Sequence, residues 1–276
     1  MYSINCKGKL IDLTTPRVMG IINLTPDSFY DGGKTTTSRE ILLQAERMLK
    51  EGASFLDLGG YSSRPGASDI SLEEELDRVL PALEAILQEF PEAIISIDTF
   101  RSEVARKAIS MGAALINDIS GGMLDREMIN TAGQLKVPYI AMHMRGTPQN
   151  MTQNTAYDEL SRDVLTYFSG RIKEANASGI NDLILDPGFG FSKTRAQSFA
   201  LLNELELFKE LELPILIGIS RKSMIYKTLD TTPENALNGT TALHSIALLK
   251  GANILRVHDV KEAMECITLI SELKRA

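Results

Sequence analysis

The chain has 276 residues, of which 43% are hydrophobic, and its formal net charge is −7. An acidic chain without a local basic patch argues against nucleic acids and anionic membranes as partners. No stretch approaches the roughly 20 apolar residues of a membrane span, and Cys6 and Cys266 lack the spacing of a disulfide framework or a metal site. We therefore expect a cytoplasmic protein with reduced thiols, folded as a single domain over residues 1–276.

Short apolar runs alternate with longer amphipathic segments along the chain. Each run is almost continuous in aliphatic residues, which is typical of parallel strands that are covered on both faces. The expected strands are Arg17–Asn23, Phe55–Gly60, Ile94–Asp98, Leu115–Ile119, Pro138–Met142, Asp182–Leu185, Ile215–Ile219 and Ile254–Val257.

The intervening segments have the apolar stripe of helices. One stripe runs over residues 72–90, and Ser71 with Glu74 predicts a capping box at its start. Thr194 and Gln197 repeat this signature before a second helix, and residues 160–172 indicate a third.

Eight strand–helix units predict an α/β fold, the (β/α)8 TIM barrel. Residues 2–13 precede the first unit and predict a short N-terminal hairpin that plugs the bottom of the barrel. An open, doubly wound sheet is the alternative, because periodicity does not show closure.

Nearly every predicted strand ends in a polar group, and in a barrel these ends form the active-site face. Asp98, Asn117 and Asp186 suit a flat heterocycle with an amino–imino edge, since carboxylates accept hydrogen bonds and amides both donate and accept them. Taken alone, Asp98 is also compatible with a helix cap. Gly188 and Gly190 allow close approach of the backbone to a ligand, and a plain turn is the alternative.

Basic residues near the same strand ends stand out in an acidic chain. Arginine and lysine there suggest an anionic, phosphorylated substrate. These residues are Arg64, Arg221, Lys222, Arg256 and His258. Taken alone, Arg64 is also compatible with a salt bridge in a loop. His143 and His258 lack the spacing of a zinc site, and His244 lies in a predicted helix, where a structural role is expected.

Eight stretches closely resemble the dihydropteroate synthase family, from about residue 17 to residue 260. They are VMGIINLTPDSFYDGG (18–33), LDLGGYSSRPGA (56–67), SIDTF (96–100), INDISGG (116–122), MHM (142–144), LDPGFGF (185–191), GISRKSMI (218–225) and RVHDV (256–260). The resemblance implies condensation of a pterin pyrophosphate with p-aminobenzoate to give dihydropteroate and pyrophosphate. It further implies sulfonamide inhibition and a homodimer.

The resemblance also implies a role for each matching residue. Asp98, Lys222, Arg256 and His258 would carry the catalysis. The pterin would be bound by Asp98, Asn117, Met142, Asp186, Lys222 and Arg256, and the pyrophosphate by Asn23, Arg64, Arg256 and His258. Asn23 would also lie near a Mg2+ ion. The p-aminobenzoate pocket would be lined by Ser63, Pro65, Gly190, Phe191, Ser220 and Lys222, and loops 25–34 and 61–68 would close over the substrates.

Three positions depart from the family pattern. Tyr61 replaces the usual Glu, Ser63 the usual Thr, and Ser192 a frequent Gly, which puts the shape of the p-aminobenzoate pocket and the turn after Phe191 in question. Three other functions are weighed. They are a pterin-binding methyltransferase, a Schiff-base lyase with Lys222 as nucleophile, and an inactive pterin-binding paralogue.

Overall fold

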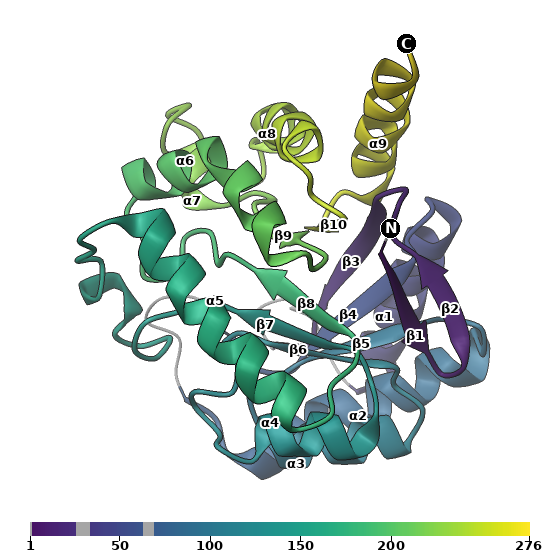
Figure 1. Ribbon diagram of the computed structural model, residues 1–276. Coiled ribbons are helices and arrows are strands. Elements are labelled where there is room, and N and C mark those ends of the chain that lie inside the picture. Colours follow the sequence, from purple (N-terminus) through teal and green to yellow (C-terminus); the bar gives the residue numbers. More distant parts are fainter. Residues whose placement is uncertain (1, 26–33, 63–68) are drawn as a thin grey trace.

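The computed structural model describes residues 2–25, 34–62 and 69–276, with only the backbone described for residues 34–37. Eight parallel strands form a ring that is surrounded by helices (Figure 1). The strands are β3 (Arg17–Asn23), β4 (Phe55–Gly59), β5 (Ile95–Asp98), β6 (Leu115–Asp118), β7 (Tyr139–Met142), β8 (Leu183–Asp186), β9 (Leu216–Ile217) and β10 (Ile254–Val257).

The ring of strands is closed. Its order is β8-β7-β6-β5-β4-β3-β10-β9, and each neighbouring pair is parallel. A parallel bridge joins Leu185 to Ile215, and the Leu185 amide donates to the Pro214 carbonyl at 2.9 Å. These contacts join β8 to β9, so the predicted barrel is confirmed and the open-sheet alternative is wrong.

The helices cover the outside of the ring and bury one side of every strand. Leu56 and Leu58 of β4, for example, belong to the same buried cluster as Val79 and Leu83 of α2. The helices are α1 (Lys34–Lys50), α2 (Leu72–Glu89), α3 (Ser102–Ser110), α4 (Met128–Leu135), α5 (Leu160–Ala177), α6 (Arg195–Asn203), α7 (Ser223–Tyr226), α8 (Leu237–Leu249) and α9 (Val260–Arg275), with 3-10 turns η2 (Met151–Gln153) and η3 (Leu205–Leu211). Within the described ranges, every helix is too short or too polar to cross a bilayer.

An N-terminal hairpin closes the bottom of the barrel, as predicted. Strands β1 (Ser3–Cys6) and β2 (Lys9–Asp12) pair antiparallel. Ile4 and Leu13 are buried in one cluster with Met19, Phe55 and Leu216, which lie in the inner core between the starts of the strands. The carboxyl ends of the strands therefore form the other face, where loops can build a site.

The predicted helix starts are found with one difference. Thr194 and Gln197 form both bonds of the capping box before α6. Ser71 accepts a bond from the Glu74 amide at 3.1 Å, but the Glu74 carboxylate pairs with Arg78 at 2.5 Å. The ion pair with Arg78, one turn further along α2, therefore engages the Glu74 carboxylate that would otherwise complete the capping box.

Strand β9 is shorter than the predicted Ile215–Ile219 and covers only Leu216–Ile217. The chain leaves the sheet after Ile217, because the Lys222 amide donates to the Ile219 carbonyl at 3.1 Å and forms a turn. This early departure brings Lys222 to the carboxyl face.

Candidate active site

The polar groups that follow the strands gather on the carboxyl face of the barrel. The strand register sets Asp98 beside Gly59 on one side and Asn117 on the other, and Met142 beside Asp186. Described residues of the predicted site that the structure brings to this face are Asn23, Asp98, Asn117, Met142, Asp186, Gly190, Phe191, Ser220, Lys222, Arg256 and His258.

Arg256 is held between two carboxylates at the centre of this face. Its Nε lies 2.5 Å from Asp57 Oδ2, and its Nη2 lies 2.6 Å from Asp98 Oδ2. Asn117 Nδ2 donates to the same oxygen of Asp57 at 2.9 Å. Asp98 is therefore an ion-pair partner and not a cap for α3, whose first amide, that of Ser102, donates to Asp125.

Asp57 is a member of the cluster that the sequence did not single out. It lies inside the apolar run Phe55–Gly59 and not at its end. The available signal was a fully buried strand that contains one charged residue, since such a charge needs a partner inside the protein.

The electrostatic environment of Asp98 opposes its ionisation. Burial raises the pKa of Asp98 to about 7, and the nearby Asp57 carboxylate adds to this effect, while Arg256 opposes it. The pKa of Arg256 is raised by its two carboxylate partners despite burial, so the guanidinium stays charged. The free site thus holds a permanent cation beside an acid that titrates near neutral pH.

Lys222 and Asp186 face each other across a space left by Gly218. A Cβ atom on Gly218 would lie 3.9 Å from both Asp186 Oδ2 and Lys222 Nζ. Lys222 Nζ donates to the Phe189 carbonyl at 2.6 Å and lies 4.6 Å from the centre of the Phe191 ring. Burial lowers the pKa of Lys222 to about 8 and raises that of Asp186.

The loop after β8 depends on glycine. Gly188 has φ +72°, and a Cβ atom there would lie 2.1 Å from the His143 carbonyl oxygen. The Gly188 amide donates to Asp186 Oδ1 at 2.8 Å, so the turn also orients this carboxylate. Gly188 is therefore required by its backbone conformation and by the approach of the His143 carbonyl.

Lys193 supports the same loop, a role that no sequence pattern indicated. Its Nζ donates to the Gly188 and Phe191 carbonyls at 3.0 and 3.1 Å and lies 2.8 Å from His143 Nδ1. Burial lowers the pKa of His143 to about 2, so its ring is a neutral acceptor for the lysine. His143 is therefore a structural residue.

Ser192, where a glycine is frequent in the family, keeps the turn by using its side chain. It has φ +50°, a conformation that favours glycine. Its Oγ accepts from the Arg145 amide at 2.8 Å and donates to the Arg145 carbonyl at 2.6 Å. These two bonds support the backbone conformation that a glycine would adopt without help.

Ser220 and His258 join the loops after β9 and β10. Ser220 Oγ lies 3.1 Å from His258 Nδ1 and accepts from the His258 amide at 3.2 Å. Arg221 was predicted to be one of the anion-binding cations. It instead forms a bidentate ion pair with Asp259, with Nη2 2.6 Å from Oδ1 and Nε 2.8 Å from Oδ2. It supports the loops rather than adding a cation to the site.

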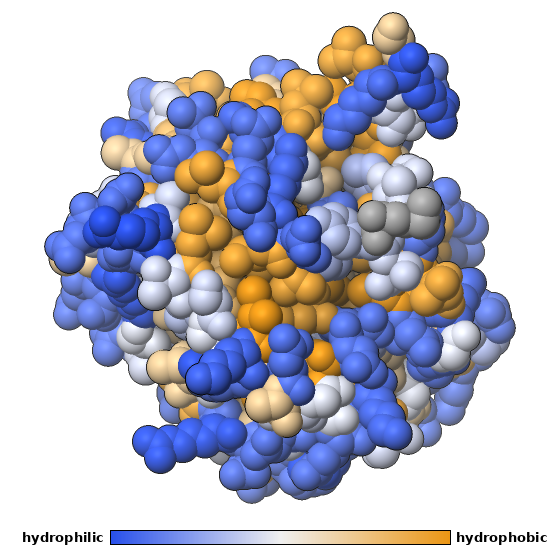
Figure 2. Space-filling view, in the orientation of Figure 1, coloured by the Kyte–Doolittle hydropathy of each residue, from blue (hydrophilic) through white to orange (hydrophobic). Residues whose placement is uncertain are grey.

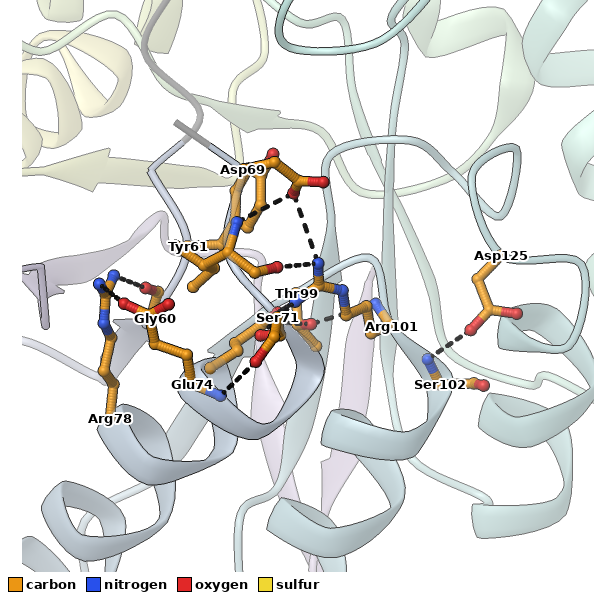
Figure 3. A network of polar contacts seen from close by, with 12 residues as sticks. Gly60, Tyr61, Asp69, Ser71, Glu74, Arg78, Thr99, Arg101, Ser102 and Asp125 are labelled. Atoms are coloured by element: carbon orange, nitrogen blue, oxygen red, sulfur yellow. Dashed lines mark hydrogen bonds and ion pairs between the residues drawn. The ribbon is translucent and has the colours of Figure 1, made fainter. Parts of the chain in front are cut away.

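Tyr61 lies next to the network of polar residues around Arg101 (Figure 3). Its hydroxyl accepts from Gln149 Nε2 at 2.6 Å, and its ring meets Phe100 edge to face at 4.9 Å. It is 9% exposed. The tyrosine that replaces the family's glutamate therefore links the loops after β4, β5 and β7.

Two arginines hold the described residues on either side of positions 63–68. Arg78 donates to the Gly60 carbonyl at 2.9 Å, and Arg101 donates to the Ile70 carbonyl at 2.6 Å (Figure 3). Arg101 also pairs with the buried Glu75 at 2.7 Å. The predicted site residues Ser63, Arg64 and Pro65 lie outside the described residues, as do residues 26–33 of the first predicted loop.

The chain is similar to known proteins over almost its whole length. The model of a family described as pterin binding enzymes matches residues 19–258. Dihydropteroate synthase of Escherichia coli K12 is 42% identical, covering 96% of this chain and 94% of the relative. That of Synechocystis is 45% identical, covering 92% and 89%.

Solved structures give the same result for the fold. Yersinia pestis dihydropteroate synthase with a sulfonamide drug has a TM-score of 0.93 and 42% identity, covering all of both chains. The Xanthomonas albilineans enzyme with 4-aminobenzoic acid has a TM-score of 0.92 and 38% identity, covering 99% of this chain and 98% of the other.

Proposed function

The chain belongs to the pterin binding enzymes, and among them to the dihydropteroate synthases, and on this premise we propose how its barrel mouth carries out their reaction. The reaction condenses 6-hydroxymethyl-7,8-dihydropterin pyrophosphate with p-aminobenzoate, and it gives 7,8-dihydropteroate and pyrophosphate. It is a transferase reaction of folate biosynthesis. The proposal rests mainly on one observation, the cluster of polar side chains on the carboxyl face of the barrel. Its members are Arg256, Asp98, Asn117, Asp186 and Lys222.

The pterin ring is bound by the acids and the amide of this cluster. Asp98 and Asp186 accept hydrogen bonds from the amino–imino edge, and Asn117 both donates and accepts. Buried Met142, 3% exposed, packs with Phe191 and supplies an apolar surface for the ring. Lys222 contacts the opposite edge, and Arg256 stacks on the ring.

The diphosphate is bound by Arg256, His258, Asn23 and Arg64. A guanidinium matches two phosphate oxygens at once, and Arg256 is charged at every working pH because of its carboxylate partners. His258 is held in place by Ser220. In this proposal the two acids bind the pterin end of the substrate, and these four residues bind its diphosphate end.

Mg2+ is the proposed metal, with Asn23 as its protein ligand. Among the described residues, no group of three or more His, Cys, Asp or Glu side chains forms a metal cage. One amide oxygen at the end of β3 fits an ion that takes its remaining ligands from phosphate and water, as Mg2+ commonly does. Such an ion would neutralise charge on the diphosphate.

The p-aminobenzoate pocket is assigned to Phe191, Gly190, Ser220 and Lys222, and the resemblance to the family adds Ser63 and Pro65, which lie outside the described residues. Gly190 has φ +77°, and a Cβ atom there would lie 3.6 Å from Lys222 Cδ, so the glycine leaves the approach to the lysine open. Lys222, 4.6 Å from the Phe191 ring centre, borders both the pterin and the aryl amine.

The mechanism needs charge stabilisation more than proton transfer. The bond between the pterin methylene and the diphosphate oxygen breaks, and its electron pair leaves with the pyrophosphate. Asp98 and Asp186 stabilise the cation that remains on the pterin, while Arg256 and His258 stabilise the departing anion. The aryl amine then attacks the methylene carbon, and its extra proton is released.

Competition by a sulfonamide tests the pocket assignment. The initial rate of dihydropteroate formation is measured with pterin pyrophosphate, Mg2+ and varied p-aminobenzoate. We expect the sulfonamide to raise the KM for p-aminobenzoate without changing kcat, because both occupy the Phe191 pocket. Inhibition that excess p-aminobenzoate does not relieve would contradict this assignment.

A homodimer in the cytoplasm is the proposed state of the enzyme. The outer faces of α8 and α9 expose Ile246, Leu249, Leu269 and Leu273, with Leu269 exposed by 70% and Leu273 by 61%. Figure 2 shows hydrophobic residues over α8 and near the end of α9 at the top of the view. Exposed apolar side chains on two neighbouring helices are typical of a subunit interface. The two cysteines are unpaired and buried, which fits a reducing compartment.

A further inference from the structure

We propose that Asp57 is a positioning residue for the reaction, holding Arg256 and Asn117 in the geometry that the pterin pocket requires. This proposal rests on the roles proposed above for those two residues. In this proposal Asp57 does not contact the substrate and acts only through Arg256 and Asn117.

Asp57 points into the barrel from the middle of β4. Side chains alternate along a strand, and its neighbours Leu56 and Leu58 both pack in the layer between the strands and the helices. The side chain of Asp57 is fully buried. It therefore lies beneath the carboxyl face, under the residues that line the mouth.

One oxygen of Asp57 serves both partners. Oδ2 lies 2.5 Å from Arg256 Nε and accepts from Asn117 Nδ2 at 2.9 Å. The partners come from β10 and β6, and neither strand is a neighbour of β4 in the sheet. The strand register does not set these contacts, so Asp57 fixes side-chain orientations across the barrel.

The second contact of Arg256 explains why this anchor matters. In the free enzyme Nη2 pairs with Asp98, the acid proposed to bind the pterin. When the pterin takes the Asp98 carboxylate, Arg256 loses that partner and keeps Asp57. An arginine side chain has several rotatable bonds, and the Nε contact with Asp57 restricts them once the Asp98 contact is released, so that Nη2 stays at the mouth and is available to the diphosphate.

Fold stability alone accounts poorly for an acid at this position. Asp57 Oδ1 finds no hydrogen-bond partner among the described residues, and neither does Oγ of its register neighbour Ser96. A buried charge with an unpaired oxygen carries a desolvation penalty, and apolar residues often replace buried ion pairs without loss of stability. What the acid contributes is the orientation of Arg256 and Asn117.

The test compares Asp57→Asn with Asp118→Asn. Asp118 is equally buried, but it bonds Ser120, Gly122 and Tyr139, none of which belongs to the site. For Asp57→Asn we expect kcat/KM for the pterin pyrophosphate to fall about 100-fold, because the neutral amide loses the ion pair that holds Arg256 and its NH2 group cannot accept a hydrogen bond. The KM for p-aminobenzoate should stay within about threefold, and Asp118→Asn should leave both constants within about threefold. Equal kinetic losses in the two variants would overturn the proposal.

A double-substitution cycle separates this inference from the proposed function. Binding of the pterin pyrophosphate is measured by calorimetry for Arg256→Ala with and without Asp57→Asn. If Asp57 acts through its partners, Asp57→Asn should weaken binding strongly in the wild-type enzyme. In the Arg256→Ala background the same substitution should weaken binding far less. Wild-type behaviour of Arg256→Ala would refute the proposed role of Arg256 itself. Wild-type behaviour of Asp57→Asn alone would refute only the role of Asp57. Should Asp57→Asn fail to fold, Asp57→Ser replaces it, since the smaller side chain fits the same space and lacks the carboxylate.

Discussion

Gly188→Ala should destabilise the enzyme and disable it at the same time. At φ +72° a residue with a side chain costs about 1–2 kcal/mol of folding free energy. The new Cβ would also lie 2.1 Å from the His143 carbonyl oxygen, a backbone atom that has little room to move. Overpacking of this kind adds about 1–3 kcal/mol, so the expected loss is about 2–5 kcal/mol.

Thermal unfolding and steady-state kinetics measure the two effects. For a chain of this size we expect the midpoint to fall by roughly 5–15 °C. The turn must shift by about an ångström, which moves Asp186, whose Oδ1 accepts from the Gly188 amide at 2.8 Å. Turnover efficiency should therefore fall about 100-fold.

Gly179→Ala is the matched control. Gly179 has φ +80°, but a Cβ atom there meets nothing within 4 Å, so this variant carries only the backbone penalty of about 1–2 kcal/mol. It lies after α5, away from the carboxyl face, and should keep its activity. If the two variants unfold at the same temperature, the steric argument about His143 is wrong.

Three further substitutions test the charges and the surface. Lys222→Ala should lower kcat/KM by on the order of 10²–10³, since it removes one charge-stabilising group, and unchanged kinetics would contradict its assignment. Burial raises the pKa of Asp98 to about 7, so the folded state holds a proton that the unfolded state releases above pH ~4. Stability from this group is present at low pH and is lost as the pH rises to about 7. Asp98→Asn should flatten that slope in urea titrations at pH 5 and 8, and an unchanged slope would count against the shift. Leu269→Glu should give a monomer in size-exclusion chromatography with light scattering, whereas Leu10→Glu, equally exposed at 70% on the hairpin, should not.

The architecture was predictable because buried parallel strands leave a strong sequence pattern. The predicted strand limits match the observed ones within two residues at every end, and only β9 is clearly shorter. Its shortening depends on a turn between Ile219 and Lys222 that an apolar run does not reveal. Closure likewise came from the backbone contacts of Leu185 and not from periodicity.

The site was predictable where polar residues follow strands or match family motifs. The supporting residues inside the barrel and behind the loops were not predicted. Asp57 lies inside a strand and Lys193 after a turn, and both act through partners distant in sequence. Their partners are defined only by the closed ring. The orientation of the Tyr61 side chain could not be predicted from the sequence. Whether it turns toward a ligand or toward Phe100 and Gln149 depends on the neighbouring loops.

The closing position of β10 has a consequence for the synthesis of the chain. Strand β10 pairs with β3 on one side and β9 on the other, although it lies more than 200 residues after β3 in sequence. Until residues 254–257 have left the ribosome, both strands keep an open row of amides and carbonyls, which other chains can pair with. A message cut short before codon 254 should therefore yield aggregates rather than a smaller active enzyme.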